Sequence, residues 1–150
     1  MEDSQNTESV TKDDSFQILQ KVEDMMNYAY PLIKKWSIAD KYTIGNDLMA
    51  CMKNMLRLSV DIREKYYKKT TLGDFDRENK TLQEFIKVAY DLKILKGMSS
   101  YKEWTKRSVE IGRMIGGFIN TVNGTNSASE NTATQKQKSS GYGSGRCKRH

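Results

Sequence analysis

The sequence predicts an all-α protein, an antiparallel up-down-up-down four-helix bundle with disordered termini. Apolar residues recur at steps of three and four in four successive segments, the spacing of one buried helix face. The 150 residues include a single proline, so few positions would interrupt long helices. The expected connections are short, about four to seven residues, and short connections join antiparallel helices. The bundle is expected over residues 15–119, between disordered segments at 1–14 and 120–150.

The chain begins with an acidic segment, residues 1–14, that has no apolar periodicity. It carries one lysine against five acidic residues, a net charge of −4, and this composition is typical of disorder. From Phe16 the apolar steps indicate the first helix, with residues 13–15 as candidate N-caps. Pro31 lies inside the pattern and predicts a kink, because the stripe continues to Trp36.

Two further helices are predicted in the middle of the chain. After a break at Ser37–Asp40, the apolar steps predict a helix over residues 41–69, which ends before Gly73. The next helix is expected over residues 74–96. Gly97 is placed just beyond its C-terminus, where glycine commonly adopts a left-handed conformation.

The fourth predicted helix contains three glycines within six residues, which is unusual because glycine weakens a helix. It opens at Ser100–Glu103, which has the form of a capping box, and is expected to end near Asn120. A fraying helix end would explain the glycines, but the apolar stripe continues through them. We therefore favour close packing within the bundle or between subunits, and the candidate residues are Gly112, Arg113, Gly116, Gly117 and Phe118. Arg113 is interpreted as an interface or ion-pair residue, with Glu110 as a candidate partner.

The sequence lacks the residue patterns of common enzyme classes. Its one histidine is His150, so neither a Ser-His-Asp nor a Cys-His arrangement is available inside the bundle. Cys51 and Cys147 form no metal-ligand spacing and no disulfide framework. We expect a non-enzymatic protein without catalytic residues, metal or cofactor. No apolar run approaches about 18 residues and the N-terminus lacks an apolar signal region, so we expect a cytoplasmic protein with no membrane segment.

The predicted bundle is basic in its own right. The chain has a net charge of +6, and residues 15–119 alone hold nineteen basic and thirteen acidic residues. A basic body suggests a polyanionic partner. The candidate phosphate-binding residues are Lys53, Arg57, Arg63, Lys80 and Lys87, which antiparallel neighbours could merge into one basic stripe. The alternative is an ordinary solvated charged surface.

Three segments carry a family resemblance. They are Lys41-Tyr42-x-Ile44-Gly45, the stretch Lys87-Val88-Ala89-Tyr90-Asp91-Leu92 followed by Tyr101, and Glu110-Ile111-Gly112-Arg113-Met114-Ile115-Gly116-Gly117-Phe118. Over about residues 15–119 the chain resembles the accessory variability determinant proteins of diversity-generating retroelements. The last segment is the most specific, because members commonly read E-I-G-R-M-L-G-G-W there. Phe118 replaces that tryptophan, and Trp36-Ser37-Ile38 stands where a Phe-Pro-Lys-like element is common.

The resemblance implies a homopentameric barrel of four-helix bundles that binds the reverse transcriptase of the element and its template RNA, with DNA as a further candidate. Such a protein would support mutagenic reverse transcription without being an enzyme. One alternative is a related four-helix protein of ribosomal RNA intervening sequences, which a neighbouring reverse transcriptase gene would distinguish. The other is a structural interaction module that binds an acidic protein, for which nucleic-acid binding would lack a steep salt dependence.

Overall fold

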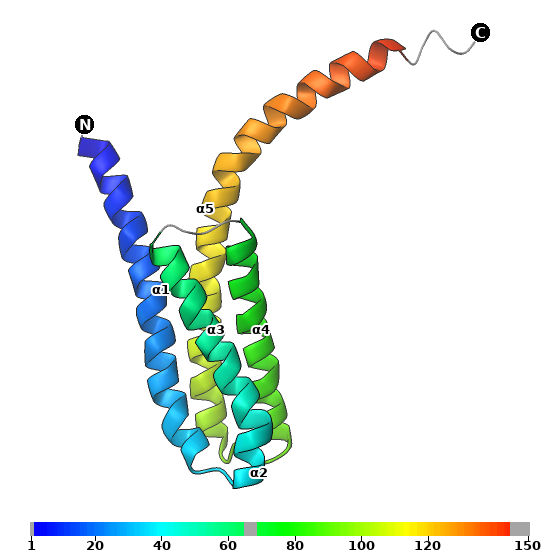
Figure 1. Ribbon diagram of the computed structural model, residues 1–150. Helices are drawn as coiled ribbons and strands as arrows, with labels where there is room; N and C mark the ends of the chain where they lie inside the picture. Colours follow the sequence, from blue (N-terminus) through cyan, green and yellow to red (C-terminus); the bar gives the residue numbers. More distant parts are fainter. Residues whose placement is uncertain (1, 65–68, 145–150) are drawn as a thin grey trace. The chain divides into compact units, whose positions relative to one another are not determined.

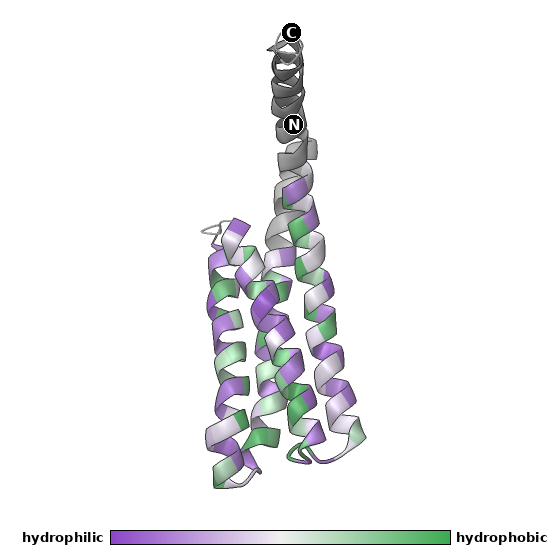
Figure 2. Ribbon diagram, turned by 90° about the vertical axis from the view of Figure 1, so that its right-hand side faces the viewer, coloured by the Kyte–Doolittle hydropathy of each residue, from purple (hydrophilic) through white to green (hydrophobic). Residues whose placement is uncertain are grey.

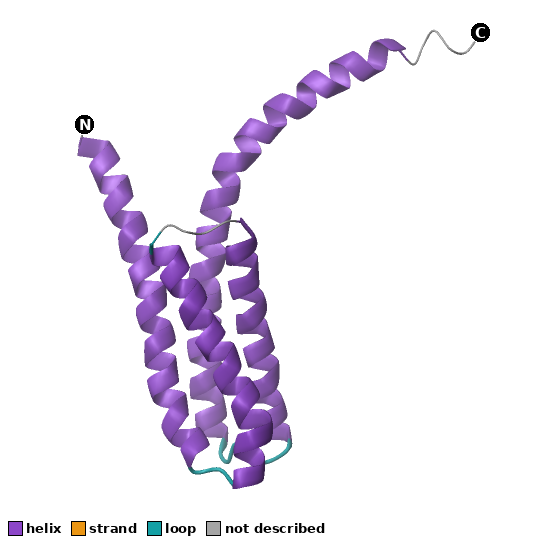
Figure 3. Cartoon of the chain, viewed as in Figure 1, coloured by secondary structure: helices purple, strands orange, loops and turns teal. Residues whose placement is uncertain are grey.

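Helices and their connections make up the part of the chain described by the computed structural model, residues 2–64 and 69–144 (Figure 3). For residues 2–13 and 125–144 only the backbone is described. The long helices are α1 (Glu2–Lys34), α3 (Asn46–Arg63), α4 (Lys69–Asp91) and α5 (Met98–Ser144) (Figure 1). The short α2 (Ile38–Asp40) and the π-helical turn η1 (Lys41–Gly45) lead directly into α3.

The chain divides into two units between Gly116 and Gly117, inside α5. The first unit holds α1 to α4 and the beginning of α5, and its four long helices form a four-helix bundle, as the sequence predicts. The second unit continues α5 to Ser144 within the described residues. In both Figure 1 and Figure 2 the α1–α2 and α4–α5 connections lie at the same end of the first unit. We call this end the loop end.

The predicted apolar stripes form the core of the first unit. Side chains from all four long helices are fully buried, including Ile18, Met25, Leu48, Met52, Met55, Ile62, Leu72, Phe75, Leu82, Ile86, Trp104 and Ile111. Figure 2 shows hydrophobic and hydrophilic residues alternating along these helices. Removing the apolar side chains from water is the main favourable contribution to folding.

The connection after α1 differs from the predicted break at Ser37–Asp40. α1 continues past Pro31 to Lys34, and the break covers residues 35–37. Ser37 is the N-cap of α2, because its Oγ accepts a hydrogen bond from the backbone N–H of Asp40 at 3.2 Å. The serine that interrupts the apolar pattern therefore begins the next helix.

The turn η1 packs Gly45 closely against the end of α1. Gly45 is buried, and a Cβ added there would lie 3.2 Å from Cγ2 of Ile33 and 3.7 Å from Cε3 of Trp36. The same Cβ would lie 3.3 Å from the carbonyl oxygen of Asp40. The missing side chain permits this approach, and π-helical turns often occur at functional sites.

The predicted boundary between the second and third long helices is wrong. The sequence predicts that a helix ends before Gly73, but Gly73 lies inside α4, which begins at Lys69, and α3 ends at Arg63. The buried stripe of α4 extends back to Leu72 and Phe75. Burial of these two side chains outweighs the helix-weakening effect of one glycine, about 1 kcal/mol.

α4 ends at Asp91, five residues before the predicted Lys96, in a Schellman turn around Lys93. Lys93 has a φ of 61°, in the left-handed region. The backbone N–H of Ile94 donates to the carbonyl of Ala89 at 3.0 Å. The N–H of Lys93 donates to the carbonyl of Tyr90, also at 3.0 Å. These bonds satisfy carbonyls that the helix end would otherwise leave unpaired.

Gly97 does not end α4 as predicted, and instead immediately precedes α5. It has a φ of 100°, and its carbonyl accepts a hydrogen bond from the N–H of Tyr101 at 3.4 Å. Because α5 already begins at Met98, Ser100–Glu103 is not the predicted capping box.

α1 and α5 extend into the segments where composition predicts disorder. α1 begins at Glu2, so the predicted N-caps at residues 13–15 lie inside it, and α5 continues past Asn120. Polar helices outside a packed core are marginal in water, and the disorder of residues 1–14 and 120–150 stays a prediction. Cys147 and His150 lie outside the described residues.

None of the helices described by the structure has an apolar stretch long enough to cross a lipid bilayer.

Candidate nucleic-acid interface

The five predicted phosphate-binding residues are all exposed on the first unit: Lys53, Arg57, Arg63, Lys80 and Lys87. Lys53 and Lys87 make no ion pair or side-chain hydrogen bond with any residue that the structure describes. Arg63 pairs with the carboxylate of Glu64 at 3.1 Å. An exposed ammonium that is not paired with a carboxylate is available to an incoming phosphate, so Lys53 and Lys87 are the best placed of the five.

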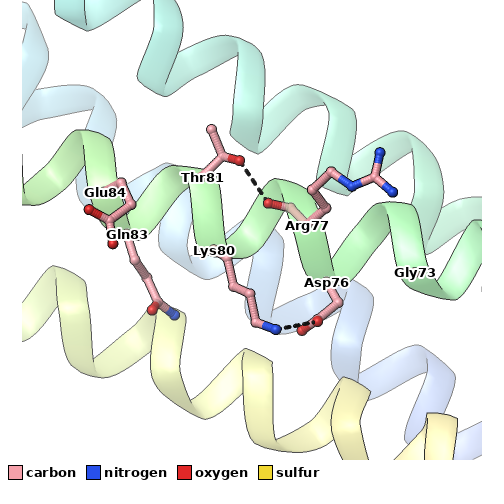
Figure 4. Close-up of a pocket in the computed structure, with 7 residues that line it drawn as sticks. All are labelled: Gly73, Asp76, Arg77, Lys80, Thr81, Gln83 and Glu84. Atoms are coloured by element: carbon pink, nitrogen blue, oxygen red, sulfur yellow. Dashed lines mark hydrogen bonds and ion pairs between the residues drawn. The ribbon is translucent and has the colours of Figure 1, made fainter.

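Lys80 belongs to a shallow pocket of about 510 Å³ on α4 (Figure 4). Its Nζ lies 2.9 Å from Oδ2 of Asp76, one helical turn earlier. Figure 4 shows Lys80, Asp76 and Gln83 on the side of α4 nearer α5, and Arg77 on the opposite side. Because Asp76 offsets the charge of Lys80, a phosphate bound here would have to compete with a carboxylate.

Arg57 lies in a different place, a groove of about 280 Å³ between α3 and α4. Its Nη1 donates a hydrogen bond to Oδ1 of Asn54 at 3.1 Å. Across the groove Arg77 lies 4.0 Å from Oδ1 of Asp74, and Glu78 also lines the groove. Two arginines here face two carboxylates, so the groove is mixed in charge.

The structure does not gather these residues in one groove, and the continuous basic stripe across neighbouring helices stays a prediction. The groove between α3 and α4 includes Arg57 but neither Lys80 nor Lys87. Lys80 projects from the other side of α4 (Figure 4). The near-heptad spacing of Lys80 and Lys87 puts them on one face of α4, but spacing within one helix does not determine which neighbouring helix that face meets.

The beginning of α5 is joined to α1 by two charged contacts. Nζ of Lys21 donates to Oε1 of Glu110 at 2.8 Å. The guanidinium of Arg107 donates to Glu103 at 3.1 Å and lies 4.9 Å from the ring centre of Tyr28. The hydrogen bond from Lys21, with its charge, lowers the pKa of the Glu110 carboxyl. The partner of Glu110 is thus Lys21, and not Arg113 as the sequence suggests.

Gly112 lies beside a buried polar pair that links α4 to α5. Oγ of Ser108 donates to Oδ1 of Asn79 at 2.7 Å, and Nδ2 of Asn79 donates to the Ser108 carbonyl at 3.0 Å. A Cβ added at Gly112 would lie 3.1 Å from the same Nδ2. This glycine therefore packs closely within its own chain, against a side chain held by two hydrogen bonds.

The other predicted packing residues have different surroundings. A Cβ added at Gly116 or at Gly117 would meet no atom within 4 Å. Arg113 is exposed and Phe118 is half-buried. Close packing at Gly116 and Gly117 thus has no partner in the described chain, and their role in an oligomer stays a prediction.

The buried core offers little chemistry. Burial, followed by the nearby Glu78 carboxylate, raises the pKa of Cys51 to about 11, which keeps the thiol protonated and unreactive near neutral pH. The described residues include no group of three His, Cys, Asp or Glu side chains that could hold a metal ion.

A lysine-rich region at the loop end was not singled out by sequence reasoning. Lys34, Lys35, Lys93 and Lys96 are exposed beside the two connections, and Lys41 is half-exposed. These residues belong to different helices and connections, so no single-helix spacing reveals them. The Lys41-Tyr42 segment was the signal that could have drawn attention to this end.

The family comparison decides the identity of the chain. The bAvd-like family matches residues 16–122, more than two thirds of the sequence, and covers the four-helix bundle together with the glycine-bearing segment of α5. The chain belongs to the bAvd-like family. Neither the comparison with curated proteins nor the comparison with solved structures finds a match. The bAvd-like assignment agrees with the resemblance to accessory variability determinant proteins carried by Lys41–Gly45 and Glu110–Phe118.

Proposed function

We propose that this bAvd-like chain is the non-enzymatic accessory protein of a diversity-generating retroelement. In this function it is a basic oligomeric scaffold that binds the reverse transcriptase of the element and its template RNA, and thereby supports mutagenic reverse transcription. The observation that carries the proposal is the family match over residues 16–122. A reverse transcriptase gene and paired template and variable repeats beside this gene are the expected genomic context.

The proposal includes an antiparallel up-down-up-down order of the long helices. The sequence of cross-helix contacts supports it. Lys21 on α1 contacts Glu110 on α5, while the later Tyr28 contacts the earlier Arg107. Likewise Asn79 on α4 bonds Ser108, while the later Tyr90 stacks on the earlier Tyr101 with ring centres 4.6 Å apart. In each pair, a step forward on one helix matches a step backward on the other.

The proposed RNA contact is electrostatic and made to phosphates. Its support is the excess of basic over acidic residues in the bundle and the exposure of Lys53 and Lys87. Side chains on a helix face would contact phosphates and not base edges. RNA binding is therefore expected to tolerate different sequences and to weaken steeply with salt. DNA presents the same phosphates and is expected to bind by the same residues.

The proposed homopentamer rests on the family resemblance, and the open glycines of α5 offer a place where another copy could pack. Gly116 and Gly117 have no neighbour within 4 Å of an added Cβ, so a backbone of another copy could approach there. The solution mass of the purified protein tests this directly. A monomer at micromolar concentration would contradict the oligomeric part of the proposal.

Charge reversal tests the RNA contact. The variant Lys80→Glu/Lys87→Glu is expected to weaken binding of a template-repeat RNA by about tenfold at moderate salt and to reduce the salt slope. Lys102→Glu/Lys106→Glu is the matched control, because it changes net charge equally on exposed positions of α5. Both variants should keep the helical circular dichroism signal. Equal losses in the two variants would show that net charge alone controls binding and would remove Lys80 and Lys87 from the site.

A further inference from the structure

The most exposed large apolar side chains of the described residues gather toward the loop end. Ile38 is 73% exposed, Tyr42 72%, Leu92 60% and Tyr30 56%. Tyr30 lies in the last turns of α1, Ile38 and Tyr42 in α2 and η1, and Leu92 directly after α4. Met98, the first residue of α5, is also exposed. A folded chain rarely leaves such side chains together in water without a partner.

The segments that carry these side chains are held firmly. The Ser37 cap fixes the start of α2, and Gly45 packs η1 against Ile33. On the other side, the Schellman turn at Lys93 fixes the chain immediately after Leu92. The apolar side chains therefore project from ordered backbone, which lowers the entropy lost when a partner binds.

Two of these side chains lie at the same level of the bundle. Asn54 on α3 and Glu78 on α4 line the same groove. In the proposed antiparallel order, moving from Asn54 back to Ile38 covers about the same length as moving from Glu78 forward to Leu92. Ile38 and Leu92 thus lie at similar levels near the loop end. We use the name loop-end patch for four exposed apolar side chains of this end: Ile38, Tyr42, Leu92 and Met98.

The charges around the loop-end patch favour an acidic partner. Five lysines lie on the connections and helix ends that surround it: Lys34, Lys35, Lys41, Lys93 and Lys96. Asp40 and Asp91 are the acidic residues of the same segments. None of the five lysines pairs with a carboxylate among the residues that the structure describes. An apolar centre with a cationic rim complements a surface with apolar side chains and carboxylates.

We propose that the loop-end patch is a protein-docking site that takes an acidic amphipathic segment of a partner protein. Three of the four side chains of the patch, Ile38, Leu92 and Met98, are aliphatic or thioether groups that pack well against Leu or Val, and only Tyr42 offers a ring on which a base could stack. This favours a protein over single-stranded RNA. In terms of the proposed function the partner is the reverse transcriptase, and to that extent the inference rests on that proposal.

A designed peptide tests the patch without reference to the reverse transcriptase. The probe is a synthetic peptide with Leu at positions i, i+3, i+4 and i+7 and Glu at most others. A peptide with Lys in place of Glu is its control. The full chain is expected to bind the acidic peptide, and Ile38→Ser/Leu92→Ser should weaken that binding by about tenfold. Val60→Ser/Val109→Ser, which changes two exposed valines elsewhere, should bind like the unaltered chain.

Three outcomes would overturn the proposal. They are failure of the full chain to bind the acidic peptide, stronger binding of the basic peptide, and equal binding by the two double variants. Circular dichroism of the variants guards against unfolding. A tenfold loss of single-stranded RNA affinity in Ile38→Ser/Leu92→Ser, with peptide binding unchanged, would instead assign the patch to nucleic acid.

The same variants measured against the reverse transcriptase separate the patch from the proposed function. If Ile38→Ser/Leu92→Ser weakens binding to the reverse transcriptase, the enzyme is the partner of the patch. If this variant binds the enzyme like the unaltered chain, the patch is not its docking site and the proposed function still stands. No binding by the unaltered chain, with peptide binding retained, contradicts the proposed function and leaves the patch standing.

Discussion

The two glycine-bearing segments of the family signature use glycine in opposite ways. In Lys41–Gly45 the glycine is buried, and an added Cβ would meet a side chain and a backbone carbonyl. In Glu110–Phe118 an added Cβ at Gly116 would meet nothing within 4 Å. The first glycine is explained by packing within one chain, whereas the second is not. A glycine inside a helix therefore indicates close packing only where the neighbouring atoms are known.

Gly112 is a third case, because an added Cβ would meet only the side chain of Asn79. The hydrogen-bonded pair of Asn79 and Ser108 beside it gives the largest expected effect on the free energy of unfolding. Asn79→Ala removes both hydrogen bonds to Ser108 and leaves a buried hydroxyl without its partner. The free energy of unfolding is expected to fall by about 3 kcal/mol, measured by urea denaturation. Asn54→Ala, which changes an amide bonded to the exposed Arg57, is the control. A loss below about 1 kcal/mol would show that the pair contributes little.

The next effect is expected at Gly45. Gly45→Val places methyl groups against Ile33 and the Asp40 carbonyl, and the resulting overpacking should lower the free energy of unfolding by about 2 kcal/mol. The matched control is Gly73→Val, at an exposed glycine inside α4 where an added Cβ meets nothing within 4 Å. Equal denaturation midpoints for the two variants would break the distinction between packed and open glycines.

A smaller effect of opposite sign is expected at Gly116. Gly116→Ala should stabilise the single chain by about 0.5 to 1 kcal/mol, because alanine favours the helix and the space is open. If Gly116 also contacts another copy, the oligomer mass measured by light scattering should fall while the thermal stability rises. A rise in stability with no change in mass would restrict Gly116 to a local role.

The smallest effect is expected at the Lys21–Glu110 pair. The lowered pKa of Glu110 means that this pair stabilises the fold above the ordinary carboxyl pKa, about 4.5, and that the contribution is lost as pH falls through the lowered value. Both side chains are well exposed, so Glu110→Gln should cost only about 0.5 kcal/mol at pH 7.

Below the lowered pKa, Glu110 is protonated and carries no charge, like the glutamine of Glu110→Gln. The substitution should therefore no longer lower the stability of the chain. The measurement is the difference in denaturation midpoint at pH 7 and at pH 3. A larger difference at pH 3 than at pH 7 would contradict the assignment of Lys21 as the partner.

The helical stripes could be predicted from sequence because burial follows a fixed period. Val22, Met25 and Ala29 on α1, and Trp104 with Ile111 on α5, are buried as their spacing predicts. The helix boundaries could not be predicted equally well. Gly73, Gly97 and Ser100 are typical boundary residues, but the boundary signals were overridden by the burial of Leu72 and by the turn at Lys93.

The candidate site was less predictable than the fold. The exposure of Lys53, Arg57 and Lys87 follows from their place opposite the apolar stripe. Which charges meet across helices depends on the rotation of each helix about its axis, which a single-helix pattern does not contain. For that reason the pairing of Lys21 with Glu110 could not be read from the sequence.

Lys93 occupies a backbone conformation that glycine would adopt at lower energetic cost. Its left-handed φ destabilises a side-chain-bearing residue by roughly 1 kcal/mol. A glycine there would leave the helix end equally well bonded but would remove one positive charge from the surroundings of the loop-end patch. The chain thus keeps a cation at a position where local conformational preference opposes it, and strain of this kind is concentrated at binding surfaces.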